Sequence, residues 1–204
     1  MKDLIVLVAD KDMELTVLGL LSRPQSLGIC AIQADVFVHP RRDPGCLLEA
    51  HAFLQPYSTY YRCALVMFDY EGCGREKDAP QTLAGEVKTR LRQTGWVAAE
   101  VVVLVPELEV WVWSASPHVA DCLGWTTHRP ALRAWLAEQQ LWPCDKPKPP
   151  EPRVALERAL REVGKPRSSA IYGALAKSVS LQGHQEPAFR SLVQCLREWF
   201  PANQ

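Results

Sequence analysis

Short apolar runs alternate along the chain with stretches in which apolar residues recur at helical spacing. Four of these runs have the length and the β-branched content of strands: residues 4–9, 31–38, 63–68 and 101–105. The helical stretches between them cover residues 13–21, 47–54 and 82–93. Because strands that alternate with helices usually pair in parallel, the pattern predicts an α/β fold with a mostly parallel sheet flanked by helices.

The chain changes character after this alternation. Tryptophan-rich sequence follows residue 111 and includes a predicted helix at 129–139, and repeated prolines after it favour an extended tether. Amphipathic patterns then predict three more helices, at 153–162, 169–178 and 187–199. We therefore divide the chain into an α/β domain at 1–142, a proline-rich linker at 143–152 and a small helical C-terminal extension at 153–204.

Charge and motif content narrow the possible functions. The 204 residues carry 23 basic and 23 acidic side chains, so no overall field draws the protein to nucleic acid or to a membrane. A local basic excess is present at 146–204, with ten basic against five acidic residues. The sequence has no P-loop, dinucleotide fingerprint, G-x-S-x-G elbow or H-E-x-x-H motif, which removes the usual support for ATP hydrolysis, hydride transfer and zinc proteolysis.

The cysteines and the apolar segments indicate the cellular compartment in which the protein is expected. The seven cysteines are scattered and never form C-x-x-C, which is typical of a reducing compartment and gives no support for a zinc site. No apolar run approaches the roughly 20 residues that span a bilayer, and the first residues are unlike a signal peptide. We expect a cytoplasmic protein with no membrane partner.

Acidic residues follow three of the four predicted strands. They are Asp10, Asp12 and Glu14 after the first strand, Asp69 and Glu71 after the third, and Glu107 and Glu109 after the fourth. In an open parallel sheet the carboxyl ends of the strands meet at one edge, where ligands bind. Crowded carboxylates repel each other and attract a divalent cation, so this edge predicts a site for Mg²⁺ or Mn²⁺, the ions that prefer oxygen ligands.

Each acidic cluster also has a plain structural interpretation. Asp10 and Asp12 are well placed to cap a helix with Glu14 in its first turn, and residues 69–72 fit an ordinary solvated turn. Glu107 is harder to explain in this way, because it lies between apolar segments where an unpaired carboxylate is costly.

Basic residues near this edge and beyond the linker are candidates for phosphate binding. Lys165, Arg167 and Ser168 precede a predicted helix whose amino terminus favours anions. Arg42 lies in the loop after the second strand together with His39, a further possible metal ligand. A capped helix start and a solvated loop are the alternatives. The tryptophans suit either base stacking or helix seams, and we favour the seams.

Three short motifs carry a family resemblance. Asp69-x-Glu71 after a buried strand resembles the D-x-D element of Toprim domains, the fold of topoisomerases, primases and OLD-type nucleases. Residues 106–113 resemble the E-x-E-x-W segment of an uncharacterised Toprim-like family common in bacterial defence loci, and residues 187–192 are similar to its closing P-S-F-x-x-F/L element. The whole chain also resembles the small MAD-family component of methylation-associated anti-phage defence systems.

The resemblance implies a Toprim-like fold and a metal-dependent phosphodiesterase or nuclease that acts on nucleic acid, DNA or RNA, beside other defence proteins. Asp69, Glu71, Glu107 and Asp10 would be catalytic, and the metal ligands would come from Asp69, Glu71, Glu107, Glu109 and Glu14. Toprim domains place a glutamate followed by glycine at the end of the first strand, whereas this chain has Ala9-Asp10-Lys11. For catalysis, Asp10 or Glu14 would have to replace that glutamate. Alternatively, the positive charge of Lys11 would neutralise the acidic cluster after the first strand. The alternative is a catalytically degenerate scaffold or adaptor that binds another defence protein.

Overall fold

Four parallel strands form the centre of the protein. The computed structural model describes residues 1–114, 116–181 and 186–202. Within these residues the strands are β1 (Lys2–Val8), β2 (Ala34–Val38), β3 (Tyr61–Asp69) and β4 (Ala98–Leu104). They pair in the order β2-β1-β3-β4, and every pair is parallel. The predicted α/β class is confirmed, and the layout is consistent with that of a Toprim-like domain.

The strand register brings all four carboxyl ends to one edge of the sheet. Val8 at the end of β1 lies beside Val38 of β2 and Met67 of β3, and Asp69 lies beside Leu104 at the end of β4. The side chains of β1 from residue 4 onward and nearly all those of β3 are buried, as the unbroken apolar runs predict for central strands. Whatever follows these strands is therefore gathered at the same edge.

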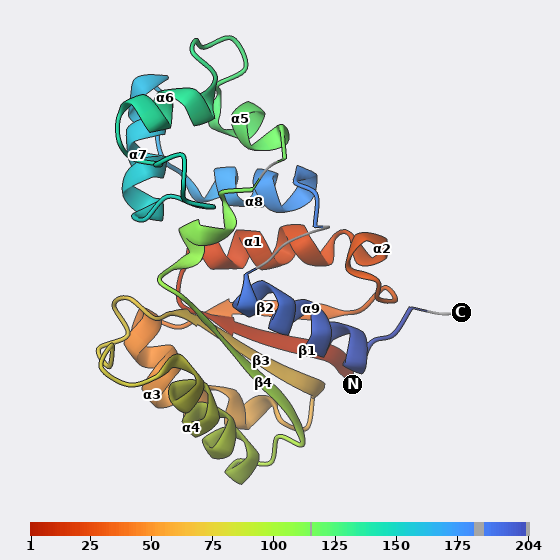
Figure 1. Ribbon diagram of the computed structural model, residues 1–204. Helices are drawn as coiled ribbons and strands as arrows, with labels where there is room; N and C mark the ends of the chain where they lie inside the picture. The colour runs from red at the N-terminus through yellow and green to blue at the C-terminus, as the bar shows by residue number, and fades with distance from the viewer. Residues whose placement is uncertain (115, 182–185, 203–204) are drawn as a thin grey trace.

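Helices cover both faces of the sheet (Figure 1). α3 (Arg42–Leu54) and α4 (Pro80–Gln93) pack on one face. α1 (Lys11–Leu21) and α9 (Pro187–Trp199) cover the other. The short helices α2 (Pro24–Leu27), η1 (Gln55–Tyr57) and η2 (Leu108–Trp111) connect these elements and carry too little periodicity to be predicted.

The remaining helices form a further layer over α1 (Figure 1). They are α5 (His118–Leu123), α6 (Leu132–Glu138), α7 (Pro152–Glu162) and α8 (Ser169–Ser178). α8 packs along α1, where a Cβ on Gly19 would lie 2.7 Å from the Cβ of Ala176, so only glycine allows this approach. α6 begins three residues later than predicted, because Pro130 disfavours a helical conformation for the residue before it.

The proline-rich segment is docked against the rest of the protein. Trp113 Nε1 donates a hydrogen bond to the Pro152 carbonyl at 3.0 Å, and Lys148 Nζ donates to the Val110 carbonyl at 2.6 Å. Lys148 also pairs with Glu186 at 2.8 Å. These contacts set the position in which α7 begins.

Several of the tryptophans fill the seams of the helical layer. Trp113 and Trp125 are almost fully buried, and the Trp125 and Trp135 rings lie 5.0 Å apart. Each helix in the described ranges is too short or too polar to cross a lipid bilayer.

Candidate metal centre

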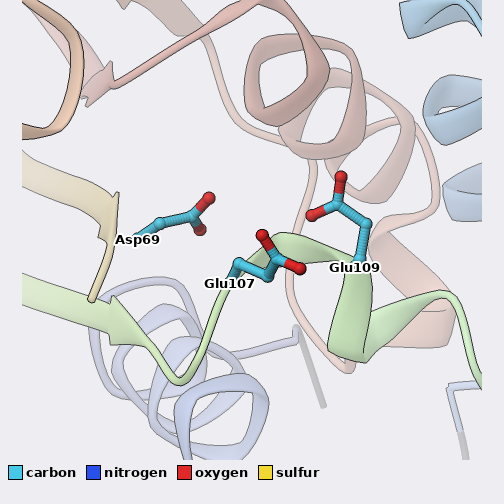
Figure 2. Close-up of side chains that lie close together, drawn as sticks. All are labelled: Asp69, Glu107 and Glu109. Carbon is cyan, nitrogen blue, oxygen red and sulfur yellow. The ribbon is translucent and has the colours of Figure 1, made fainter. Parts of the chain in front are cut away.

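Three buried carboxylates meet at the carboxyl edge of the sheet (Figure 2). Asp69 ends β3, whereas Glu107 and Glu109 follow β4 on either side of the start of η2. Each offers an oxygen, and these three oxygens lie within 4.8 Å of one another. The residues are only 5%, 5% and 1% exposed, respectively. The structure thus brings together three of the acidic residues that the sequence singles out, and we call them the acidic triad.

Backbone hydrogen bonds between the two strand exits produce this convergence. The amide of Tyr70 donates to the Leu104 carbonyl at 2.8 Å, and the amide of Glu71 donates to the Pro106 carbonyl at 2.9 Å. The chain then turns into η2, and the amide of Leu108 donates to Asp69 Oδ1 at 2.8 Å. This last bond orients the Asp69 carboxylate toward the neighbouring glutamates.

Arg153, in the first turn of α7, pairs with all three members of the triad. Its guanidinium lies 2.8 Å from Glu107 Oε2, 3.3 Å from Glu109 Oε1 and 4.0 Å from Asp69 Oδ2. Its own amide also donates to Glu107 Oε1 at 3.2 Å. Burial opposes the charge on Arg153, but the Glu109 and Glu107 carboxylates outweigh it and raise the pKa of this side chain. An internal cation therefore already neutralises part of the site.

Arg167 supplies a second internal cation. Its Nη2 lies 2.8 Å from Glu109 Oε1 and 2.8 Å from Asp12 Oδ2. The Tyr172 hydroxyl, from α8, donates to the same Glu109 oxygen at 2.7 Å. Ser169 donates to the other oxygen of Asp12. Glu109 Oε1 is thus crowded with donors, whereas its Oε2 is buried and has no hydrogen-bond partner in the described part of the chain.

Two aspartates extend the acidic region around the triad. Asp10 caps α1, where its Oδ1 accepts from the Met13 amide at 2.9 Å. Asp43, in the first turn of α3, accepts from the Asp69 amide at 2.8 Å. Burial raises the pKa of both carboxyl groups, and repulsion from neighbouring acids adds to the rise. The functional and structural interpretations of Asp10 are therefore compatible, since the cap lies beside the site.

The carboxylates perturb one another strongly. Burial raises the pKa of Asp69 well above its usual range, and repulsion from Asp43 and Glu109 raises it further. Burial followed by repulsion from Glu109 raises the pKa of Glu107 to about 7, although Arg153 pulls it down. Strong perturbation by burial together with like charges is typical of functional sites.

The donor set fits a hard divalent cation. The carboxylates in this region are Asp10, Asp12, Asp43, Asp69, Glu107 and Glu109. Among residues 1–114, 116–181 and 186–202, only Arg153 and Arg167 pair with them, so these acids outnumber the arginines by three to one when all are ionised. All the ligands are oxygens, which suits Mg²⁺ or Mn²⁺ rather than Zn²⁺. The buried, unpartnered Glu109 Oε2 is an acceptor that such an ion would satisfy.

Two of the predicted acidic ligands lie outside the triad. Glu71 is exposed at the start of the loop after β3, and its charge contributes to the raised pKa of Glu107. Glu14 pairs with Lys11 at 2.7 Å on the first turn of α1. Lys11 therefore neutralises Glu14 rather than the triad.

The predicted phosphate-binding residues are dispersed. Arg167 reaches the triad, but Lys165 Nζ donates to the Cys122 carbonyl at 2.6 Å, at the end of α5. Ser168 precedes α8 without a side-chain capping bond and is exposed. Arg42 is exposed at the start of α3.

His39 has a structural environment. It is 3% exposed, and its Nδ1 accepts from the Arg41 amide at 3.1 Å. Burial lowers the pKa of the imidazole. Because Nδ1 already accepts a hydrogen bond from the backbone of its own loop, the structure favours the interpretation of His39 as part of an ordinary loop.

Comparison with known proteins identifies no relative. Neither the family models, nor the curated proteins, nor the solved structures contain a match to this chain.

Proposed function

We propose that the protein is a Mg²⁺- or Mn²⁺-dependent phosphodiesterase or nuclease module that acts on nucleic acid within a prokaryotic anti-phage defence system. The observation that carries the proposal is the convergence of Asp69, Glu107 and Glu109, one of whose buried oxygens lacks a partner. The defence context and a cytoplasmic location come from the sequence resemblance and belong to the proposal.

The triad would hold the ion, with Asp10 and Asp43 close enough to raise its negative potential. A divalent cation at this place would polarise a phosphoryl oxygen and activate water, which phosphodiester hydrolysis requires. Burial beside Glu109 raises the pKa of Glu107 in the absence of an ion, and a bound divalent cation would favour its ionised form as a ligand. Leu108 and Tyr172 fix the orientation of Asp69 and Glu109 through their hydrogen bonds.

The experiment is a cleavage assay on DNA, RNA and cyclic nucleotides with purified protein and Mg²⁺ or Mn²⁺, with and without products of neighbouring genes. Asp69→Asn and Glu107→Gln should each reduce cleavage by at least about 100-fold, as expected for groups that act in the transition state. Glu100→Gln, an acid-to-amide change on β4 where the glutamate pairs with Lys88, is the matched control and should retain activity. No cleavage of any substrate by the metal-loaded protein would contradict the proposal.

A second candidate function is that of a degenerate scaffold or adaptor that binds another defence protein. The observation in its favour is that Arg153 contacts all three carboxylates, in a chain that also lacks the glutamate at the end of the first strand. Asp69→Ala combined with Glu107→Ala separates the two. A scaffold keeps its partners in co-purification and keeps protection against phage, whereas an enzyme loses protection at unchanged expression.

A further inference from the structure

We propose that Arg153 is an exchangeable cation, which leaves the acidic triad when a divalent ion enters and then binds a phosphate group of the substrate together with Arg167. This inference rests on the proposed metal site and adds a phosphate-binding residue that the sequence pattern does not reveal. The ligand class is a phosphate monoester or diester.

The two guanidiniums lie side by side. Both contact Glu109 Oε1, Arg153 through Nε at 3.3 Å and Arg167 through Nη2 at 2.8 Å. Such a pair of like charges is tolerated because carboxylates surround it. When a divalent ion takes over the triad, Arg153 loses all its paired carboxylates and Arg167 loses Glu109 but keeps Asp12, so the pair of guanidiniums gains room for an anion. Phosphate suits this position, because its oxygens accept paired hydrogen bonds from a guanidinium fork.

Arg153 is built so that its side chain can move while its backbone stays in place. Its side chain is 45% exposed, although the triad side chains beneath it are only 6%, 6% and 2% exposed. The backbone is fixed by the bond from its amide to Glu107 Oε1 and by the preceding Pro152, whose carbonyl accepts from Trp113. A rotation about side-chain bonds therefore turns the guanidinium toward solvent without disturbing α7.

Arg167 is less free to leave. It is held by Asp12 at 2.8 Å and by the Tyr172 hydroxyl at 2.9 Å, in addition to Glu109. Asp12 is not a member of the triad, so this ion pair persists when the triad binds an ion. We infer that Arg167 is the fixed half of the phosphate site and Arg153 the mobile half.

The test measures two ligands separately on Arg153→Met, which keeps an unbranched apolar stem but removes the guanidinium and its charge. Mn²⁺ binding is measured alone, by titration calorimetry or electron paramagnetic resonance. Inorganic phosphate binding is then measured at saturating Mn²⁺. Removal of the competing cation should strengthen Mn²⁺ binding by about tenfold or more, and loss of the guanidinium should weaken phosphate binding by a similar factor. Arg158→Met, on the same helix at an exposed position, should change neither affinity.

Opposite changes in the two affinities are the signature of exchange, because a merely structural role would weaken both. Arg153→Lys provides a second variant if the methionine protein folds poorly. It keeps the charge, so Mn²⁺ affinity should stay within about threefold of the wild type while phosphate affinity falls. Unchanged or weaker Mn²⁺ binding in Arg153→Met, or retained phosphate binding, would overturn the inference.

The affinity measurements on Arg153→Met test the exchange of Arg153 separately from the proposed phosphodiesterase activity, which the cleavage assay tests. Opposite affinity changes without cleavage of any substrate would support exchange and refute the phosphodiesterase. Cleavage that depends on Asp69 together with parallel affinity changes in Arg153→Met would support the enzyme and refute exchange. Absence of Mn²⁺ binding to both the wild type and Arg153→Met would refute both.

Discussion

Replacement of Glu107 by glutamine should make the protein more stable at pH 8 and leave its stability almost unchanged at pH 5. The pKa of Glu107 is about 7 in the folded protein because the side chain is buried beside Glu109. A carboxyl group whose pKa is raised by folding binds its proton more tightly in the folded state. Its contribution to stability is therefore complete below about pH 4.5 and is lost as the pH rises through about 7.

The structure sets the size of the effect. One pKa unit corresponds to about 1.4 kcal/mol, so a change from 4.5 to about 7 is worth at most about 3.5 kcal/mol of unfolding free energy. The amide of the variant stays neutral at every pH in this range and keeps an oxygen that accepts from the Arg153 amide. The stability difference, variant minus wild type, should grow by about 2–3 kcal/mol between pH 5 and pH 8.

The assay is urea denaturation followed by tryptophan fluorescence at several pH values, without divalent ions. Glu86→Gln is the matched control. The Arg75 guanidinium lowers the pKa of Glu86, so its contribution is lost only as the pH falls below about 4.5 and the stability difference should be constant between pH 5 and pH 8. If Glu107→Gln gives an equally constant difference, the carboxylate is not desolvated and the account of the triad is wrong.

Three other outcomes follow from the same contacts. Mg²⁺ or Mn²⁺ at about 100 times its dissociation constant should raise the melting temperature by roughly 5–10 °C at pH 8 and by less at pH 5. Asp69→Asn should abolish this rise, and scanning calorimetry measures it. Gly45→Ala should cost about 2–3 kcal/mol in urea denaturation, because its Cβ would lie 2.0 Å from Nδ1 of the buried His39, whereas Gly85→Ala in α4 meets nothing within 4 Å and should gain up to about 1 kcal/mol. Lys165→Met should lose about 1 kcal/mol of stability by the same assay and leave phosphate affinity unchanged, because Lys165 bonds to the Cys122 carbonyl; weaker phosphate binding would contradict this placement.

The sheet could be predicted because its strands are buried on both faces. The runs at 4–9, 63–68 and 101–105 have no polar position, which is typical of parallel strands covered by helices. β2 is half-buried at the edge of the sheet and starts at Ala34, three residues later than its apolar run suggests. The two ends of an edge strand depend on contacts with residues far away in the sequence, and a local pattern does not contain these contacts.

The convergence of the acidic triad could be predicted from the sequence because of the sheet topology. In a parallel sheet, residues that directly follow adjacent strands must lie at one edge, and Asp69 and Glu107 do so. Asp43 carried the same signal, since it begins the helix after the second strand, but the surrounding prolines and glycine favoured a plain loop.

The groups that complete the site could not be predicted. Arg153 and Tyr172 belong to helices far along the chain, and their contacts with Glu109 depend on how α7 packs against η2 and α8 against α1. No local spacing encodes such packing. The one available hint was the local excess of basic residues at 146–204, which indicates anion contacts without naming them.

The surplus of buried acid separates the two candidate functions more sharply than any single contact. A scaffold that needs only a stable fold gains nothing from a Glu107 that costs stability at neutral pH, or from a Glu109 oxygen buried without a partner. Such costs are typical of sites at which ligand binding restores the lost free energy. Arg153 and Arg167 reduce the cost in the absence of an ion, yet two positive charges do not balance three carboxylates. A divalent cation together with Arg167 supplies three positive charges, and in the proposed exchange the entry of the ion releases Arg153.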